Sequence, residues 1–347
     1  MAGIVIGPVV PAQDAQPAGG RGGPGPSGPD KIAPATAPAP EPVPKPVPVD
    51  VDKRSVTIWS DGTRIAGDLY APKVRSAGEK LPAIVICVGT GGTKGHTGRR
   101  MGVIFARHGY IALAFDYRGW GESERQLMAV DPQPSHFDAN NEMTIKVKAL
   151  RWQMNYADQT GDIRAAISFI FGEPGVDPKR IALWGSSYGG GLVTWVAGND
   201  PRVKCLAAQV PGMAASMGVG NPARMDYVYE LATKQARGET EPVPIETGKL
   251  TGTLSRYPQM RRNPVKTIGF NPVEASAKIT VPSLFVVAEK DELTDNATVE
   301  RVQQNIAKRG LPSAYHVIKG ITHYGIYKEG FDEATNVELT WFDKYLK

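Results

Sequence analysis

The chain has 347 residues, of which 41% are hydrophobic and 22% charged, a composition typical of a soluble globular protein with a large core. Its net charge of +5 is modest for this length, and its arginine pairs (99–100 and 261–262) are not interleaved with aromatic residues, so nucleic-acid binding is not expected. Cys87 and Cys205 lie in apolar runs without metal-ligand spacing. We expect buried free thiols, no metal site and no cofactor.

Residues 1–50 differ sharply from the rest of the chain. They hold 13 of the 29 prolines, 8 glycines and no aromatic residue. Because proline fixes φ and lacks an N–H, the run from Pro34 to Pro48 predicts an extended, polyproline-like spacer. This disordered segment or linker leaves 51–347 as one domain, near the upper size of a single hydrophobic core.

The first ten residues, Met1 to Val10, are apolar but too short to cross a membrane, so no membrane span is expected. They carry no basic residue, but they fit the remnant of a signal peptide, with small residues from Ala12 to Ala18 near a cleavage site. The location expected on this interpretation is secreted or periplasmic. An unstructured tail on a cytoplasmic protein is the alternative.

From residue 54 onward, strand-like and helix-like segments alternate. Residues 56–59 and 65–70 flank the turn 60–62 and predict an antiparallel hairpin. The continuous apolar run 83–88 is typical of a strand buried on both faces. A helix over 99–107 and a strand over 110–115 follow.

The same alternation continues to the C-terminus. Helices are predicted over 160–171, 188–198, 297–308 and from about 334, and strands over 181–184, 203–210, 282–288 and 314–318. This order predicts an α/β fold with a mainly parallel sheet covered on both faces. Two long stretches, 122–158 and 211–275, interrupt the pattern and are predicted to be inserted lids or binding loops.

The most informative motif is Gly185-Ser186-Ser187-Tyr188-Gly189, which fits G-x-S-x-G. It falls between a predicted buried strand and a predicted helix, where the serine of this pattern lies on a sharp turn with its hydroxyl projecting from the sheet. Ser187 is therefore the candidate nucleophile. Taken alone, the pattern also fits a Gly/Ser loop, so the assignment depends on a base and an acid in the required order.

A serine nucleophile needs a general base, and in this topology the histidine comes last in the chain. Of five histidines, only His316 and His323 follow Ser187. His316 falls inside the predicted strand 314–318, whereas His323 follows its carboxyl end, at the same sheet edge as Ser187. His323 is the predicted base.

The histidine in turn needs a carboxylate that orients it, expected just past an earlier strand. Strand 282–288 runs into an acidic segment, in which Asp291 fits best because it lies a few residues beyond the strand and has a short side chain. Glu289 and Asp295 are alternatives, although Asp295 precedes a helical run and fits an N-cap.

An oxyanion hole needs two backbone N–H groups. One is predicted to be that of Tyr188, at the start of the helix after the nucleophile. The other is expected from the glycine-rich turn after strand 83–88, with Thr90 as the first candidate and Gly91 as the second. A phosphate-binding role for these glycines lacks the G-x-x-x-x-G-K-[ST] pattern.

These motifs resemble those of the α/β-hydrolase superfamily over about residues 54–347. The segment Phe115-Asp116-Tyr117-Arg118-Gly119-Trp120-Gly121-Glu122-Ser123 looks like the D-x-R-G-x-G-x-S segment of dienelactone-hydrolase-like, acetyl-xylan-esterase-like and X-Pro-peptidase-like proteins. The resemblance implies an eight-stranded sheet, a Ser-Asp-His triad and an ester- or amide-type substrate. Asp116 and Arg118 are expected to brace their turn rather than take part in chemistry.

Three departures from the family pattern narrow the expected activity. Dienelactone hydrolases have cysteine where this chain has Ser187, the usual His-Gly before the oxyanion loop is Val88-Gly89, and the extra domains and acidic amine pocket of X-Pro peptidases are not evident. We expect a serine hydrolase that cleaves carboxylic esters of small molecules through an acyl-enzyme. A peptidase or amidase, and an acyltransferase or thioesterase, are the alternatives, and a non-catalytic binding protein is disfavoured. Aromatic residues of the insertions are expected to line a pocket or fill a lid core (Phe137, Trp152, Tyr156, Tyr227, Tyr229).

Overall fold

The computed structural model describes residues 46–133, 138–213, 222–243 and 259–347. The predicted spacer over 1–50 lies almost wholly outside the described residues, as does the whole of the predicted signal-peptide remnant. Strand β1 (Val51–Ser60) begins where the predicted spacer ends. Among the described residues, no helix is both long enough and apolar enough to cross a lipid bilayer.

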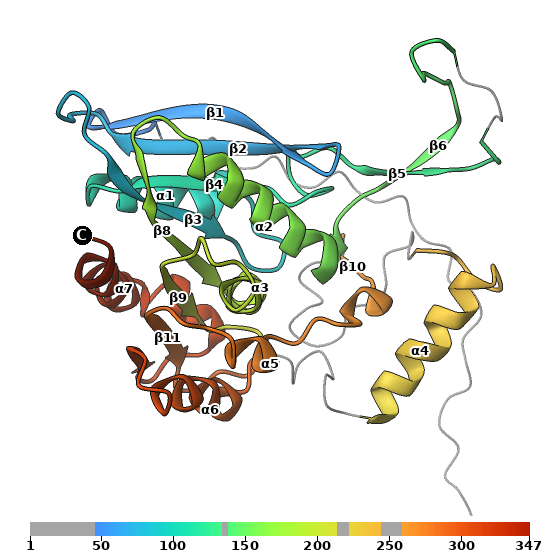
Figure 1. Ribbon diagram of the computed structural model, residues 1–347. Coiled ribbons are helices and arrows are strands. Elements are labelled where there is room, and N and C mark those ends of the chain that lie inside the picture. The colour runs from blue at the N-terminus through green and yellow to red at the C-terminus, as the bar shows by residue number, and fades with distance from the viewer. Residues whose placement is uncertain (1–45, 134–137, 214–221, 244–258) are drawn as a thin grey trace, which may run out of the picture. The chain divides into compact units, whose positions relative to one another are not determined.

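An eight-stranded sheet forms the centre of the fold (Figure 1). Its order is β1-β2-β4-β3-β8-β9-β11-β12, with β2 (Thr63–Pro72), β3 (Leu81–Cys87), β4 (Ile111–Phe115), β8 (Val176–Ser186), β9 (Cys205–Gln209), β11 (Ser283–Ala288) and β12 (Ser313–Ile318). Strand β2 runs antiparallel to both neighbours, and all other neighbouring pairs are parallel. The predicted α/β-hydrolase sheet is confirmed.

Helices cover both faces of this sheet (Figure 1). On one face α1 (Arg99–Arg107) and α7 (Phe331–Leu346) meet through Phe105 and Phe342, whose ring centroids are 5.7 Å apart. The other face carries α2 (Tyr156–Phe171), α3 (Tyr188–Ala197) and α6 (Asn296–Ala307). Because both faces are covered, every residue of β3 and β4 is buried, which explains their uninterrupted apolar sequences.

Helix α2 and strand β8 begin earlier than their apolar patterns predict. Helix α2 begins at Tyr156 rather than at residue 160, because Asn155 caps it by accepting the backbone N–H of Asp158 at 3.1 Å. The predicted insertion 122–158 therefore ends at this cap. Strand β8 begins at Val176 rather than at residue 181, because its polar first half extends to the start of β3, where Val176 pairs with Leu81.

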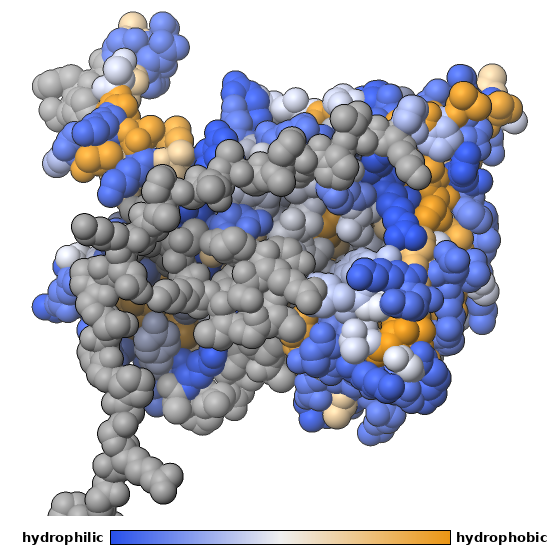
Figure 2. Space-filling view, turned by 180° about the vertical axis from the view of Figure 1, so that it is seen from behind, coloured by the Kyte–Doolittle hydropathy of each residue, from blue (hydrophilic) through white to orange (hydrophobic). Residues whose placement is uncertain are grey.

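The insertions contain two small two-stranded sheets, one within the first insertion and one that joins the two. β5 (Gln126–Ala129) and β6 (Val147–Leu150) form an antiparallel arm, on which Figure 2 shows apolar residues gathered; Leu127, Val130 and Val147 are exposed. After the arm, β7 (Gln153–Met154) pairs in parallel with β10 (Arg261–Arg262) of the second insertion. That insertion also contains α4 (Pro222–Ala236), the 3₁₀ turn Pro264–Thr267 and α5 (Pro272–Ser276).

Candidate active site

Ser187 lies on the sharp turn between β8 and α3 that the motif predicts. Its backbone has φ 53° and ψ −117°, a left-handed conformation that a non-glycine residue adopts only when its surroundings hold it. The Ser187 N–H donates to the carbonyl oxygen of Gln209 at 2.9 Å, and its carbonyl accepts from the Gly212 N–H at 2.8 Å. Gly189 is required for close approach, since a Cβ there would lie 2.2 Å from the carbonyl oxygen of Cys87.

His323 joins the serine to a carboxylate. Its Nε2 lies 2.9 Å from Ser187 Oγ, and its Nδ1 lies 2.9 Å and 3.0 Å from the two carboxylate oxygens of Asp291. Both the imidazole and the Asp291 side chain are shielded from solvent. With the ring proton on Nδ1 donated to Asp291, Nε2 is free to accept the serine proton.

Asp291 is held by its own turn. Its Oδ1 accepts the backbone N–H groups of Leu293 at 2.9 Å and Thr294 at 2.8 Å. Burial raises the pKa of the carboxyl group. The hydrogen bond from His323 and these two N–H groups lower it by more, so the pKa of Asp291 lies below its ordinary value. Asp291 is therefore ionised at neutral pH.

The other predicted candidates lie elsewhere. Glu289 accepts from the Gly320 N–H at 2.8 Å, Asp295 caps α6 by accepting the Ala297 N–H at 3.1 Å, and His316 is bound to Glu333 at 2.7 Å. None of these three side chains forms a hydrogen bond with Ser187 or His323 in the described structure.

Two supporting groups were not predicted. Glu292 accepts the backbone N–H of His323 at 3.0 Å. Ser186, the first serine of the motif, is fully buried, with its hydroxyl 2.5 Å from the Tyr327 hydroxyl and 2.8 Å from Gln209 Nε2. These partners are more than 20 residues distant along the chain, so no local pattern signals them.

The two predicted oxyanion donors, Tyr188 and Thr90, line the same cavity as Ser187. Tyr188 is the first residue of α3, so its N–H lies at the free end of the helix. Thr90 belongs to a tight turn in which the Gly92 N–H donates to the Gly89 carbonyl at 3.0 Å. The turn packs closely on Ser187, since a Cβ at Gly89 would lie 3.1 Å from the Cβ of Ser187.

The segment after β4 has a bracing role, as expected. Asp116 accepts the backbone N–H groups of Lys94 at 2.7 Å and Glu122 at 2.9 Å, which closes the turn. Burial raises the pKa of Asp116 to about 6, although these hydrogen bonds oppose the rise. Arg118 forms a buried ion pair with Asp162 at 2.7 Å.

A cavity of about 120 Å³ opens beside Ser187. It is lined by Thr90, Met154, Tyr156, Ser187, Tyr188, Gly212, Arg224, Val228, Arg262, Asn263, Pro264, Thr267, Leu293 and Thr294. The predicted insertions therefore contribute to its wall. Among the described residues, no cluster of three or more His, Cys, Asp or Glu side chains is placed to hold a metal ion.

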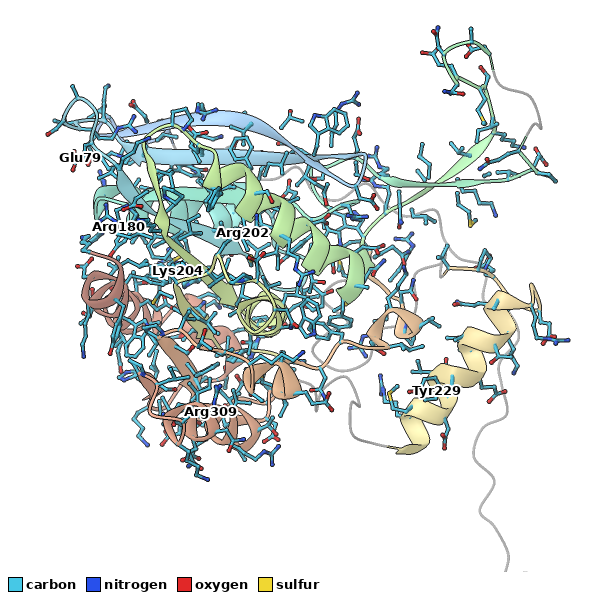
Figure 3. The ribbon with its side chains drawn as sticks, viewed as in Figure 1. Glu79, Arg180, Arg202, Lys204, Tyr229 and Arg309 are labelled. Carbon is cyan, nitrogen blue, oxygen red and sulfur yellow. The ribbon has the colours of Figure 1, made fainter. Side chains whose placement is uncertain are left out.

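Of the insertion aromatics that the structure describes, Tyr156 alone lines this cavity. Trp152 packs on Trp120 with ring centroids 5.8 Å apart, and Tyr227 and Tyr229 on α4 are exposed (Figure 3 labels Tyr229). Phe137 lies outside the described residues.

Two family profiles match the chain. The profile described as acetyl xylan esterase (AXE1) matches residues 55–218, and that of the prolyl oligopeptidase family matches residues 149–347. Ser187 lies in the segment that both profiles match, whereas Asp291 and His323 lie in the second alone.

Similar proteins come from bacteria and fungi. The chain is 27% identical over 289 residues to an Escherichia coli protein described as an uncharacterized 31.7 kDa protein in the traX-finO intergenic region, covering 77% of this chain and 92% of that protein. It is 26% identical over 269 residues to the quorum-quenching protein AidA of Acinetobacter baumannii, covering 70% and 80% respectively.

A third relative has a solved structure. Polyketide transferase GrgF of a Penicillium species is 27% identical over 172 residues, which are 50% of this chain and 48% of that protein. The crystal structure of α/β hydrolase GrgF from Penicillium sp. sh18 superposes with a TM-score of 0.62 at 19% identity, covering 85% of this chain and 99% of that chain. This structural likeness shows a shared fold.

Proposed function

Because the chain belongs to the prolyl oligopeptidase family of the α/β-hydrolase superfamily and is a serine hydrolase, we propose that it cleaves carboxylic esters. Ser187 is the nucleophile, His323 the general base, and Asp291 the carboxylate that orients the base. The observation that carries the proposal is the position of the His323 ring, whose two nitrogens each lie 2.9 Å from one of the other two groups.

The reaction proceeds in two acyl-transfer steps. Ser187 Oγ attacks the ester carbonyl carbon while His323 Nε2 takes the hydroxyl proton, and His323 then gives this proton to the departing alkoxide. Water then transfers a proton to His323 and attacks the acyl carbonyl carbon. His323 returns this proton to Ser187 Oγ as the acyl–oxygen bond breaks, which releases the acid and restores both residues. The ionised Asp291 stabilises the imidazolium that forms in each step.

The negative charge on the carbonyl oxygen is the costliest feature of both transition states. The backbone N–H groups of Tyr188 and Thr90 are proposed to bind it, and losing one such donor typically costs about 3–4 kcal/mol of transition-state stabilisation. The start of α3 adds the positive end of its helix dipole at the same point.

Esters are favoured over peptides by the composition of the cavity. A peptidase that trims a free amino end needs a carboxylate to bind the ammonium group, and no aspartate or glutamate is among the described residues that line the cavity. Acyl transfer or thioester cleavage is the second candidate, since GrgF is described as a polyketide transferase.

The test is a chain-length series of p-nitrophenyl esters on the wild type and on Ser187→Ala. We expect hydrolysis by the wild type, with a chain-length optimum that measures the pocket, and its loss in the variant. Equal hydrolysis by both proteins would contradict the proposal. Matched thioesters, aminoacyl p-nitroanilides and added alcohol acceptors then distinguish ester hydrolysis from the other activities.

A further inference from the structure

The described wall of the cavity beside Ser187 carries cationic side chains. Among its described lining residues are two arginines, Arg224 on α4 and Arg262 on β10, and no acidic residue. The pairing of β10 with β7 sets Arg262 opposite Met154, another lining residue. Both guanidinium groups are close enough to Tyr156, a third lining residue, to affect its pKa. Burial raises the pKa of the Tyr156 phenol far above its ordinary value, and the charges of Arg262 and Arg224 oppose this rise.

Arg262 has no protein counter-ion in the described structure. Its guanidinium makes no hydrogen bond or ion pair with another described residue. The neighbouring Arg261 differs, since it donates to the carbonyl oxygens of Arg151 at 3.3 Å and Gln259 at 2.8 Å. A guanidinium presents coplanar N–H donors that match the two oxygens of a carboxylate. Arg262 is therefore available to bind an anion in the cavity.

Asn263 gives a second, independent indication of a ligand. The residue is 3% exposed, lines the cavity, and its Oδ1 accepts no hydrogen bond from the described part of the chain. Buried polar atoms almost always have a partner, so an unpaired one at a cavity wall indicates a polar ligand. This part of the wall is suited to the polar end of a substrate rather than to a hydrocarbon chain.

We propose that the ester cleaved at Ser187 carries a carboxylate, which Arg262 binds while Arg224 adds positive charge from α4. This inference rests on the proposed function, because it names the substrate class of the same site. A guanidinium edge matches the two oxygens of a carboxylate, and this group is small enough for a cavity of about 120 Å³. The same two arginines disfavour a substrate that carries an ammonium group.

The experiment compares ester pairs that differ only in the carboxylate. Mono-p-nitrophenyl adipate carries it at the end of the acyl chain, and p-nitrophenyl hexanoate is the neutral counterpart; the succinate–butyrate and suberate–octanoate pairs vary the length. After subtraction of the uncatalysed rate, the wild type is expected to have the higher kcat/KM for the dicarboxylate ester. Arg262→Met is expected to lower the adipate-to-hexanoate ratio about tenfold.

A second arm places the carboxylate on the alcohol part. It compares 4-carboxyphenyl butyrate with its methyl ester, and the ratio between wild type and variant cancels the intrinsic reactivity of each compound. The ester series whose rate ratio changes in Arg262→Met shows whether the cavity holds the acyl part or the alcohol part of the substrate. Discrimination is expected to fall as the salt concentration rises, because Arg262 is exposed to solvent.

Two control variants accompany the test. Arg262→Lys keeps the positive charge and is expected to retain part of the preference. Lys204→Met removes a positive charge at the amino end of β9, whereas Ser187 follows the carboxyl end of β8 (Figure 3 labels Lys204). This variant is expected to leave both ratios unchanged. A drop of the same size in Lys204→Met would assign the effect to overall charge and overturn the inference.

The remaining outcomes separate the two proposals. If the wild type cleaves neutral esters through Ser187 but shows no Arg262-dependent preference in either arm, the carboxylate inference is wrong and the ester hydrolase stands. If no ester is cleaved and a fluorophosphonate does not label Ser187, the proposed function fails, and this inference fails with it.

Discussion

The Glu292 carboxylate accepts the backbone N–H of His323 at 3.0 Å, one residue after the aspartate that holds the imidazole ring. Consecutive acidic residues thus fix the backbone and the side chain of the proposed base. Glu292 is not among the described residues that line the cavity, so this contact makes it a candidate positioning residue.

Removal of this acceptor should loosen the proposed base without removing it. Glu292→Ala is expected to lower kcat about tenfold with little change in KM, because a small displacement of the base weakens proton transfer. Glu292→Gln keeps an acceptor oxygen and should restore most of the rate. Steady-state kinetics on a p-nitrophenyl ester check this, and an unaltered kcat in Glu292→Ala would show that the contact has no positioning effect.

The two serines of the motif should behave oppositely. Ser187→Ala is expected to lower kcat by about 10⁴-fold or more with the stability unchanged. Ser186→Ala removes the partner of Tyr327 and Gln209 and should instead destabilise the fold by about 1–2 kcal/mol while retaining fluorophosphonate labelling. Urea denaturation and labelling distinguish the two. A labelled Ser187→Ala protein would assign the nucleophile to another residue.

Glu338 on α7 is fully buried beside the indole N–H of Trp184, whose effect on its pKa opposes that of burial. Burial raises its pKa from 4.5 to about 8, so the folded protein holds a proton that the unfolded chain releases above about pH 4.5. The contribution of Glu338 to stability is thus fully present below pH 4.5 and is lost as the pH rises towards 8.

Glu338→Gln should remove this loss, since the amide cannot ionise. The difference in unfolding free energy between the variant and the wild type is expected to grow in favour of the variant by about 3 kcal/mol from pH 5 to pH 8. Urea denaturation at several pH values measures it. A difference that is constant with pH would show that Glu338 does not titrate in this range.

Arg118 and Asp162 form a buried pair whose loss should be structural. Asp162 accepts from Arg118 at 2.7 Å and from Ser60 at 2.8 Å. Arg118→Met leaves an unpaired buried carboxylate and is expected to cost about 3–5 kcal/mol, of which the double variant Arg118→Met/Asp162→Leu should recover part. Thermal and urea denaturation provide the measurement. If the loss of unfolding free energy in the double variant equals the sum of the losses in the two single variants, the two residues act independently.

Much of this molecule could be predicted from local patterns. The apolar runs of β3, β4 and β11 indicate strands that are buried on both faces, and this fixes the parallel sheet. Once the sheet is known, chain order places Ser187, Asp291 and His323 at one edge. The choice of Asp291 over Glu289 followed from side-chain length and distance past the strand, both of which are local properties.

What could not be predicted depends on contacts between distant parts of the chain. The start of α2 was missed because its first turn buries the polar residues Gln159 and Thr160, which interrupt the apolar period. Glu292 is exposed in the structure and its sequence context is that of any surface acid, while its partner His323 lies 31 residues away along the chain. Arg262 is one of two adjacent arginines, and only its pairing with Met154 distinguishes the one that lines the cavity.

The short parallel pairing of β7 with β10 also restricts which insertions and deletions this part of the chain can accept. It ties residues 153–154 to residues 261–262, and the Asn263 N–H adds a bond to the Met154 carbonyl at 3.3 Å. A deletion or insertion in either segment therefore shifts the cavity wall contributed by both. Exchange of substrate preference between relatives should require transplanting the two segments as a matched set, since one alone would arrive without the strand that positions it.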